Sequence, residues 1–211
     1  MNSNFIETIF NNCQNSENNK TNNWLNKKES FFKVLNEFHA KLNNSQKGDF
    51  VEGLQRINSF DYFERVIRSV LNFNYLVNVK EEGFKFILLC AAIESLEKFN
   101  KNTRGDSKAV FKRFFYFSDE STRKNLIEKF QIVNKKDVLD SKKLDLIIDY
   151  IYLKRNRFLH EGVHFSFATE EIIKLDLFED YLIRFSMKFS DLEDFYMRTL
   201  VYIMKKGCCC E

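Results

Sequence analysis

Apolar residues recur at intervals of three and four along most of the chain, the spacing that places side chains on one face of an α-helix. One such run begins at Ser30 and a second at Ser59, with a polar break over residues 43–58 between them. The strongest run covers residues 81–100, and its apolar positions are Phe84, Ile87, Leu88, Ala91, Ala92, Leu96 and Phe99. The pattern therefore predicts three helices in the first half of the chain.

The second half continues this pattern. Residues 107–117 and 119–133 predict two short helices, the second with Asp119 as its N-cap. A longer helix begins near Asp140, ends at Gly162, and buries Leu144, Ile147, Ile148, Ile151 and Tyr152. A last helix is predicted from about residue 178, with a near-heptad seam of Phe178, Leu182, Phe185, Phe189, Leu192, Tyr196 and Ile203. Such a seam fits packing within one subunit or between two.

Composition supports long helices. The chain has no proline and only 6 glycines, so few residues interrupt a helix, and its 24 Phe and 8 Tyr are interpreted as core residues. We predict an all-α fold, a compact helical bundle with additional N-terminal helices. The predicted parts are a flexible Asn-rich arm (1–28), an N-terminal helical extension (29–79), a helical domain (80–206) and a Cys-rich tail (207–211).

The segments of a secreted or membrane protein are not evident. No apolar run is long enough to span a bilayer, and the first 20 residues do not form a signal peptide. The cysteines form neither a disulfide framework nor a zinc-type pair, and His160 and His164 have no evident third ligand. We therefore expect a cytoplasmic protein without a membrane contact, a cofactor or a metal.

Charge is unevenly distributed along the chain. From Lys98 to Arg157 there are 16 Lys and Arg against 8 Asp and Glu, a net charge of +8, while the whole chain has +3. A basic segment of this kind is what a phosphate-binding surface needs, and it is also typical of a solvated helical face.

The stretch KRNRFLHEG at residues 154–162 places an arginine inside an apolar stripe. Burying Arg155 is costly unless its charge meets an anion. One solution is a buried partner such as Glu94 or Asp149, and the other is a phosphate bound in a cleft. The imidazole of His160 is a group that can accept and give a proton, and Asn156, one turn before it, can orient the imidazole or bind a substrate.

This stretch also resembles a known family. Arg155-Asn156-Arg157-Phe158-Leu159-His160 is similar to the Arg-polar-x3-His motif of HEPN domains, and "LLCAAIESLEKF" (88–99) and "KAVFKRFFYF" (108–117) are similar to two helices of the Apea-like HEPN group. The resemblance covers about residues 80–205, and Arg157 adds a charge inside the motif that the family often lacks.

The resemblance implies a compact helical domain and a metal-independent endoribonuclease that leaves 2′,3′-cyclic phosphate ends. It implies a homodimer in which the two motifs meet at one cleft, with RNA as substrate. Arg155 and His160 are then catalytic, and Asn156 orients. Glu94 is a supporting residue, either as the partner of Arg155 or as a structural feature of the family. A toxin or antiviral effector with an antitoxin or defence-system partner protein fits this reading.

Two other interpretations stay open. One is a non-catalytic interaction module that binds a partner protein or a nucleotide through the same cleft, and the other is a helical scaffold in which Arg155 is paired internally. Further candidates for contacts with the RNA backbone are Lys154, Arg157, Lys112 and Arg113. Exposed motif residues in a dimer groove would favour the nuclease, and a closed, buried Arg155–Glu94 pair would favour the scaffold.

Overall fold

The computed structural model describes residues 3–14, 27–96, 107–135, 137–162, 171–175 and 181–206. Its α-helices are α1 (Ser3–Gln14), α3 (Lys28–Lys41), α4 (Asn44–Gln55), α5 (Phe60–Tyr75), α6 (Glu82–Ser95), α7 (Ser107–Phe117), α8 (Glu120–Ile127), α9 (Asp140–Glu161) and α10 (Phe189–Lys206), with a 3-10 turn η1 (Leu76–Asn78). Three short strands, β1 (Phe130–Ile132), β2 (Glu171–Leu175) and β3 (Tyr181–Phe185), form an antiparallel sheet in the order β1-β3-β2. The predicted all-α fold is confirmed, with this small sheet as an addition.

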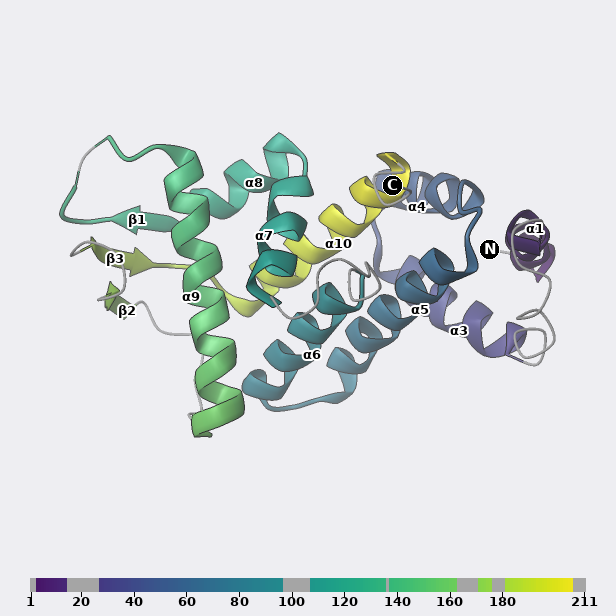
Figure 1. Cartoon of the computed structure of the whole chain (residues 1–211), viewed down its shortest axis with the longest axis horizontal. Coiled ribbons are helices and arrows are strands. Elements are labelled where there is room, and N and C mark those ends of the chain that lie inside the picture. The colour runs from purple at the N-terminus through teal and green to yellow at the C-terminus, as the bar shows by residue number, and fades with distance from the viewer. Residues whose placement is uncertain are drawn as a thin grey trace.

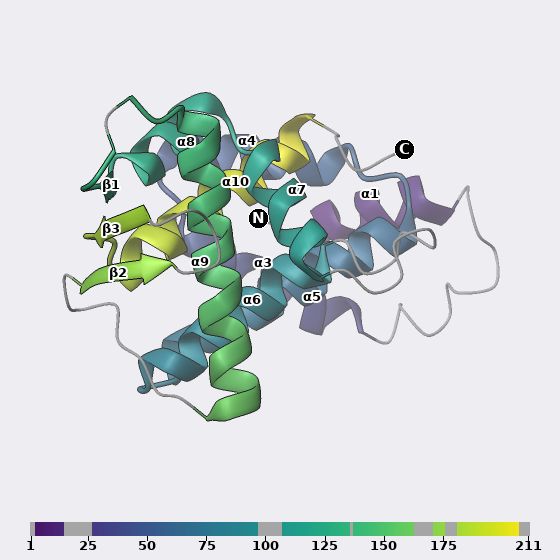
Figure 2. The same cartoon turned by 60° about the vertical axis from the view of Figure 1, so that its left-hand side comes forward.

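The helices form a bundle, and α9 stands across one end of it (Figure 1). Helices α5 and α6 lie side by side, and α10 packs against α4, α6, α7 and α8. Helix α9 contacts α6, α7 and α8, and the small sheet lies on its other side in both views (Figures 1 and 2). The C-terminal end of α9 therefore reaches the edge of the molecule beside the start of α6.

The core is built around Tyr196 of α10, which is fully buried. Its ring stacks on Phe73 at 4.7 Å between centroids and on Phe114 at 5.8 Å. The Ser69 hydroxyl donates to the Ala92 carbonyl at 2.7 Å, so the Tyr196 hydroxyl donates to Ser69 Oγ at 2.6 Å. This buried network joins α5, α6 and α10. Each hydroxyl in it has a hydrogen-bond partner, as buried polar groups require.

The N-terminal helices belong to the same core as the rest of the chain. Gly53 of α4 touches α10 so closely that a Cβ there would lie 2.7 Å from Met204 Cβ. Lys205 Nζ donates to Asp49 Oδ1 at 2.7 Å, and Arg56 Nη1 donates to the Lys205 carbonyl at 2.6 Å. The predicted extension (29–79) and the predicted domain (80–206) are therefore packed as one unit.

Two predictions for the first half of the chain are wrong. Part of the expected flexible arm is helix α1, whose Ile9 and Cys13 are buried against the body. The expected polar break over 43–58 is mostly helix α4, which starts with a capping box between Asn43 and Gln46. The apolar pattern does not predict this helix, because only Phe50, Gly53 and Leu54 are buried in it.

The last helix begins at Phe189 and not near residue 178. Leu182 lies in β3, which pairs with both other strands, and residues 130–132, expected at the end of a helix, form β1. Within β3, Leu182 is exposed and Ile183 is buried, the alternation of a strand. Some predicted parts lie outside the described residues: Phe178, the end of the strongest predicted helix with the residues after it (97–106), and the Cys-rich tail. The predicted N-cap Asp119 and the predicted end at Gly162 are confirmed.

Candidate functional site

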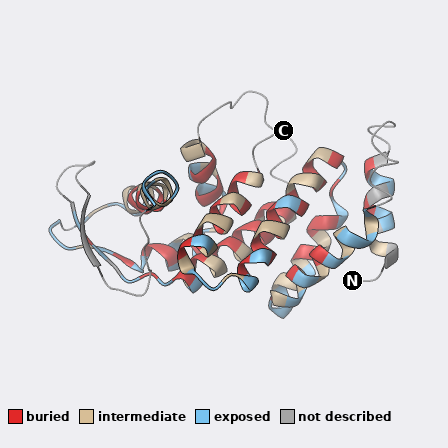
Figure 3. Ribbon diagram, turned by 90° about the horizontal axis from the view of Figure 1, so that it is seen from below, coloured by how far each residue is buried: buried red, intermediate tan, exposed pale blue. Residues whose placement is uncertain are grey.

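The motif lies in the last two turns of α9. Residues 144–151 of this helix are largely buried, whereas Arg157 and residues 159–162 are exposed. In Figure 3, which views α9 almost end-on, the turn nearest the viewer has the colour of exposed residues. Gly162 ends the helix in the left-handed conformation, with a φ of 65° that favours glycine. The helix therefore brings its motif from the buried interface out to the surface.

Arg155 is held by three neighbours. Its Nη2 lies 2.8 Å from Glu94 Oε1 of α6, and its Nη1 donates to Asn156 Oδ1 at 3.1 Å. Its guanidinium also lies 5.7 Å from the ring centre of Tyr152. The side chains of Arg155 and Glu94 are 17% and 7% exposed, so the pair is largely but not fully closed to solvent. Of the two anionic partners that the sequence suggested, Glu94 is the one used, because Asp149 pairs with Lys108 at 2.6 Å.

A buried cysteine of α6 lies close enough to this ion pair to feel both of its charges. Cys90 lies one turn before Glu94 on α6 and is 2% exposed. Burial raises the pKa of the Cys90 thiol well above its usual range, although the charge of Arg155 opposes that change. The thiol is thus neutral at physiological pH, and the anion that faces Arg155 from α6 is Glu94.

His160 and Asn156 lie on the flank of α9. His160 is exposed, and Asn156, one turn earlier, is half-buried. Asn156 Oδ1 accepts a hydrogen bond from Arg155, so the amide orients the guanidinium. The sequence had suggested a different role, in which Asn156 orients the imidazole of His160 or binds a substrate. The exposed imidazole is accessible to a molecule that approaches this end of α9.

The candidates for RNA contacts fall into two places. Lys154 and Arg157 flank Arg155, and the Lys154 ammonium lies 5.3 Å from the ring centre of Tyr150. Lys112 of α7 instead pairs with Asp145 at 3.0 Å, and the hydrogen bond to that carboxylate raises the pKa of Lys112.

Asp145 precedes Arg155 by about 15 Å along the helix, at 1.5 Å per residue. Lys112 and its neighbour Arg113 therefore lie at the level of the first turns of α9, away from the motif. The excess of cations in the middle of the chain is also partly neutralised locally, since Lys108, Lys112 and Lys143 all pair with carboxylates of α9.

Two features of the site were not predicted from the sequence. Tyr152 was assigned to the core, yet its ring also contacts the guanidinium; its position three residues before Arg155 was the available signal. Gly83 lets α6 approach α9, because a Cβ at this glycine would lie 2.4 Å from the Phe158 ring.

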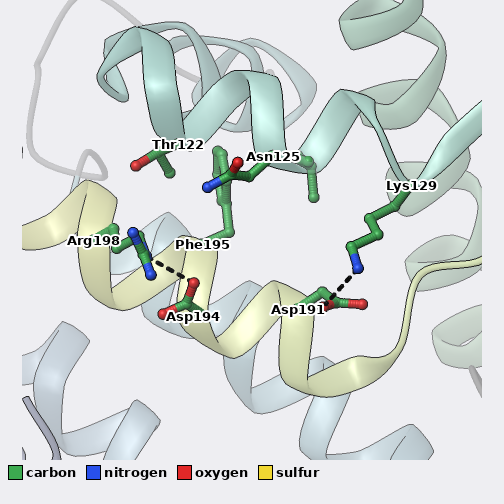
Figure 4. Close-up of a pocket in the computed structure, with 8 residues that line it drawn as sticks. Thr122, Asn125, Lys129, Asp191, Asp194, Phe195 and Arg198 are labelled. Atoms are coloured by element: carbon green, nitrogen blue, oxygen red, sulfur yellow. Dashed lines mark hydrogen bonds and ion pairs between the residues drawn. The ribbon is translucent and has the colours of Figure 1, made fainter.

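Three hollows in the described part of the chain lie away from the motif. A small hollow of about 50 Å³ lies between α8 and α10. Arg198 pairs there with Asp194 at 2.7 Å, and Lys129 faces Asp191 at 3.9 Å. Figure 4 shows how these side chains lie around the hollow. Two larger, open hollows lie against α4, α8 and α10 and against β1. None of these three contains a residue predicted for the site.

Comparison with protein-family models, with curated proteins and with solved structures finds no match to this chain. Among the described residues no group of three or more His, Cys, Asp or Glu side chains is placed to hold a metal ion. In the same part of the chain, no helix has the length and apolar character needed to cross a bilayer. A function is therefore inferred from the motif residues and their geometry alone.

Proposed function

We propose that this protein is a metal-independent endoribonuclease of the HEPN type, which acts at a cleft shared by two copies. The observation that carries the proposal is the arrangement at the end of α9: an Arg155 oriented by Glu94 and Asn156, and an exposed His160 on the same helix. A role as a toxin or antiviral effector, with a protein partner that controls it, is part of the same proposal.

The reaction needs two proton transfers. When the RNA 2′-hydroxyl attacks the neighbouring phosphorus, a base takes its proton, and an acid protonates the departing 5′-oxygen, which leaves a 2′,3′-cyclic phosphate and a 5′-hydroxyl. Each chain contributes His160 to these roles, so two copies related by a two-fold axis supply both groups.

Arg155 would stabilise the charge that grows on the phosphorane. A guanidinium has five N–H donors, and the contacts with Glu94 and Asn156 use two of its nitrogens, one each. The remaining donors are available to phosphate oxygens. Since Glu94 and Asn156 fix the orientation of the group before substrate arrives, little reorganisation is needed in the transition state. Lys154 and Arg157 would contact neighbouring phosphates.

One observation favours a structural role for Arg155, as in the helical scaffold, and fits a non-catalytic module that binds a protein or a nucleotide through other residues. The charge of Arg155 is already compensated by Glu94, and the pair is mostly shielded from solvent. In this alternative the pair fastens α9 to α6, and exposed residues such as His160 and Arg157 make the contacts with a partner.

The test is cleavage of varied single-stranded and structured RNAs in EDTA by the wild type, His160→Ala and Arg155→Ala. We expect the wild type to cut and leave cyclic phosphate ends, and each substitution to lower the rate by about 100-fold or more. His39→Ala is the matched control, because His39 lies on α3, far along the chain from the motif. Folding of each variant is checked by circular dichroism.

Two results would contradict the proposal. An inert wild type on all RNAs would favour the binding module, and the next measurement would then be capture of nucleotides and of partner proteins. Equal cleavage by the wild type and both motif variants would remove Arg155 and His160 from the chemistry.

A further inference from the structure

An open hollow of about 670 Å³ runs along strand β1, away from the motif. It is lined by residues 130–133 on one side and by Val138 and Lys143, at the start of α9, on the other. In Figure 1 the chain leaves β1, turns back and enters α9, so the hollow lies between the strand and the returning chain. Lys143 precedes Arg155 by about 18 Å along α9, at 1.5 Å per residue. The hollow is therefore separate from the candidate site.

Strand β1 is an edge of the sheet, as Figures 1 and 2 show, and its outer side faces this hollow. Gln131 is paired with Arg184, and Val133 N donates to Leu182 O at 2.7 Å. Because backbone groups alternate in direction along an antiparallel strand, the N–H and C=O of Ile132, between these two positions, point away from β3. In the part of the chain that the structure describes, no further strand pairs with β1 on that side. Such an edge can accept an added strand.

The lining of the hollow is basic. Three cations, Lys135, Lys143 and Arg184, stand against one carboxylate, Asp137, which gives a net charge of +2. Lys143 also lies 3.1 Å from Asp140, whose side chain is 68% exposed, so this surface pair is weak and can rearrange. An extended segment that carries carboxylates is therefore attracted to the hollow, whereas a basic segment is repelled.

The exposed face of the sheet next to this edge alternates between polar and apolar pairs. Gln131 and Arg184 are paired, and both are exposed. One pair further along, Val133 is 51% exposed and lies beside Leu182, which is 37% exposed. Since residues two apart in a strand lie on the same face, an added strand meets the polar pair and the apolar pair in turn. A segment with an acidic residue followed two positions later by an apolar residue fits this face.

We propose that β1 is a docking edge for an extended acidic segment of a partner protein, which joins the three-stranded sheet beside β1. The backbone of the segment bonds with Ile132, its carboxylates meet the three cations of the hollow, and its apolar side chains lie against Val133. Strand β1 has only three residues, which span roughly 10 Å at about 3.3 Å per residue, so charge supplies much of the selectivity. This inference does not depend on the nuclease, because the motif takes no part in the docking edge.

The first test is fluorescence polarisation with the full chain and the peptide fluorescein-Glu-Thr-Val-Thr-Glu-Thr-Val-Thr-Glu-amide. The wild type is compared with Lys135→Gln/Arg184→Gln and with the matched control Lys33→Gln/Arg68→Gln, which removes the same charge from α3 and α5. We expect the wild type and the control to bind alike, and Lys135→Gln/Arg184→Gln to raise the dissociation constant by roughly three- to tenfold. The same peptide with Lys in place of Glu should not bind.

Two further measurements test the added strand itself. N-methylation of alternate residues removes the N–H groups along one edge of the peptide. Of the two peptides methylated in the two alternate sets, one should lose binding to the wild type and the other should keep it. Ile132→Pro removes the outward N–H of β1 and leaves the bonds to β3, so it should fold, as circular dichroism checks, and bind about tenfold more weakly.

Several results would overturn the docking edge. One is a wild type that does not bind the acidic peptide, and another is equal binding by the wild type and Lys135→Gln/Arg184→Gln. Binding of both methylated peptides would mean a contact through side chains alone, without an added strand. An oligouridylate of the same length that displaces the peptide at a lower concentration than unlabelled peptide would assign these cations to nucleic acid instead. None of these measurements involves RNA cleavage, so their outcome is independent of the nuclease.

Discussion

The ion pair between Arg155 and Glu94 is the residue-scale feature on which both the fold and the candidate site depend. Glu94 is 5% exposed as a whole residue, so each charge relies on the other for compensation. Removing one partner from such a pair leaves a charge without its counterion, whereas replacing both by apolar residues is often neutral. The pair can therefore be tested separately as a structural element and as part of a catalytic site.

We expect Glu94→Leu to lower the free energy of unfolding by about 3 kcal/mol, at the lower end of the range for broken buried pairs because the guanidinium keeps some contact with water. The double variant Glu94→Leu/Arg155→Leu should recover most of this loss. Urea unfolding at pH 7 measures both. The free energy lost by Arg155→Leu is measured in the same way. If the double variant loses as much free energy of unfolding as the two single variants together, the two side chains do not interact.

At the scale of elements, helix α4 contains two glycines in contrasting places. A Cβ at Gly48 would have no atom within 4 Å, whereas a Cβ at Gly53 would lie 2.7 Å from Met204 Cβ and 3.0 Å from the backbone of the same residue. We expect Gly48→Ala to stabilise the protein by about 0.5–1 kcal/mol, because alanine is the better helix former.

We expect Gly53→Ala to destabilise the protein by roughly 1–3 kcal/mol, because α10 must move away. The midpoints of thermal unfolding for both variants test the two predictions together. A rise for Gly53→Ala would mean that α4 and α10 are not in this close contact.

The start of α8 gives a pH-dependent element. Asp119 accepts hydrogen bonds from Thr122 N at 3.0 Å, Thr122 Oγ1 and Ser121 Oγ. Partial burial acts to raise the pKa of this carboxyl, but the hydrogen bonds outweigh it, and the pKa lies below its usual value of 3.8. Because the pKa is lower in the folded state, the contribution to stability is present above pH 3.8 and is lost as the pH falls through the folded-state pKa.

We expect Asp119→Ala to lower the free energy of unfolding by about 0.5–2 kcal/mol at pH 7, the usual effect of a lost N-cap. The difference from the wild type should shrink as the pH falls below 3.8. Asp119→Asn keeps an N-cap without a carboxylate, so its stability should lack this part of the pH dependence. Urea titrations between pH 2 and 7 measure the three proteins, and a difference that does not change with pH would contradict the assignment.

At the scale of the whole molecule, the sequence predicted the helical class and the helices α5, α6, α7 and α9, and it offered Glu94 as one of two possible anionic partners of Arg155. These succeed because the apolar spacing in them is regular and because a buried arginine needs an anion. It missed α4, whose buried face is narrow, and it extended α10 backwards over β3. Leu182 and its neighbours fit a helical spacing by chance, and pairing with the nearby β2 and with β1, which is distant in the sequence, decides for a strand.

The predicted boundary between residues 79 and 80 does not separate two cores. Helices α5 and α6 pack on each other, and Tyr196 stacks on Phe73 from the other side of the boundary. We expect a chain that starts at residue 80 to lose cooperative thermal unfolding and near-ultraviolet circular dichroism. Phe73→Ala in the full chain, which should cost about 3–5 kcal/mol yet leave a folded protein, is the milder comparison. A cooperative transition of the short chain would restore the two-part division.

The contact between α4 and α10 has a consequence for biosynthesis. Lys205 and Asp49 are separated by 156 positions along the chain. At roughly 5–20 residues per second, a ribosome that has just made α4 needs about 8–30 s more to reach α10. During that time Phe50 and Leu54, which are fully buried in the finished protein, lack the helix that covers them. We therefore expect chaperones that shield apolar segments to bind the nascent chain during this interval.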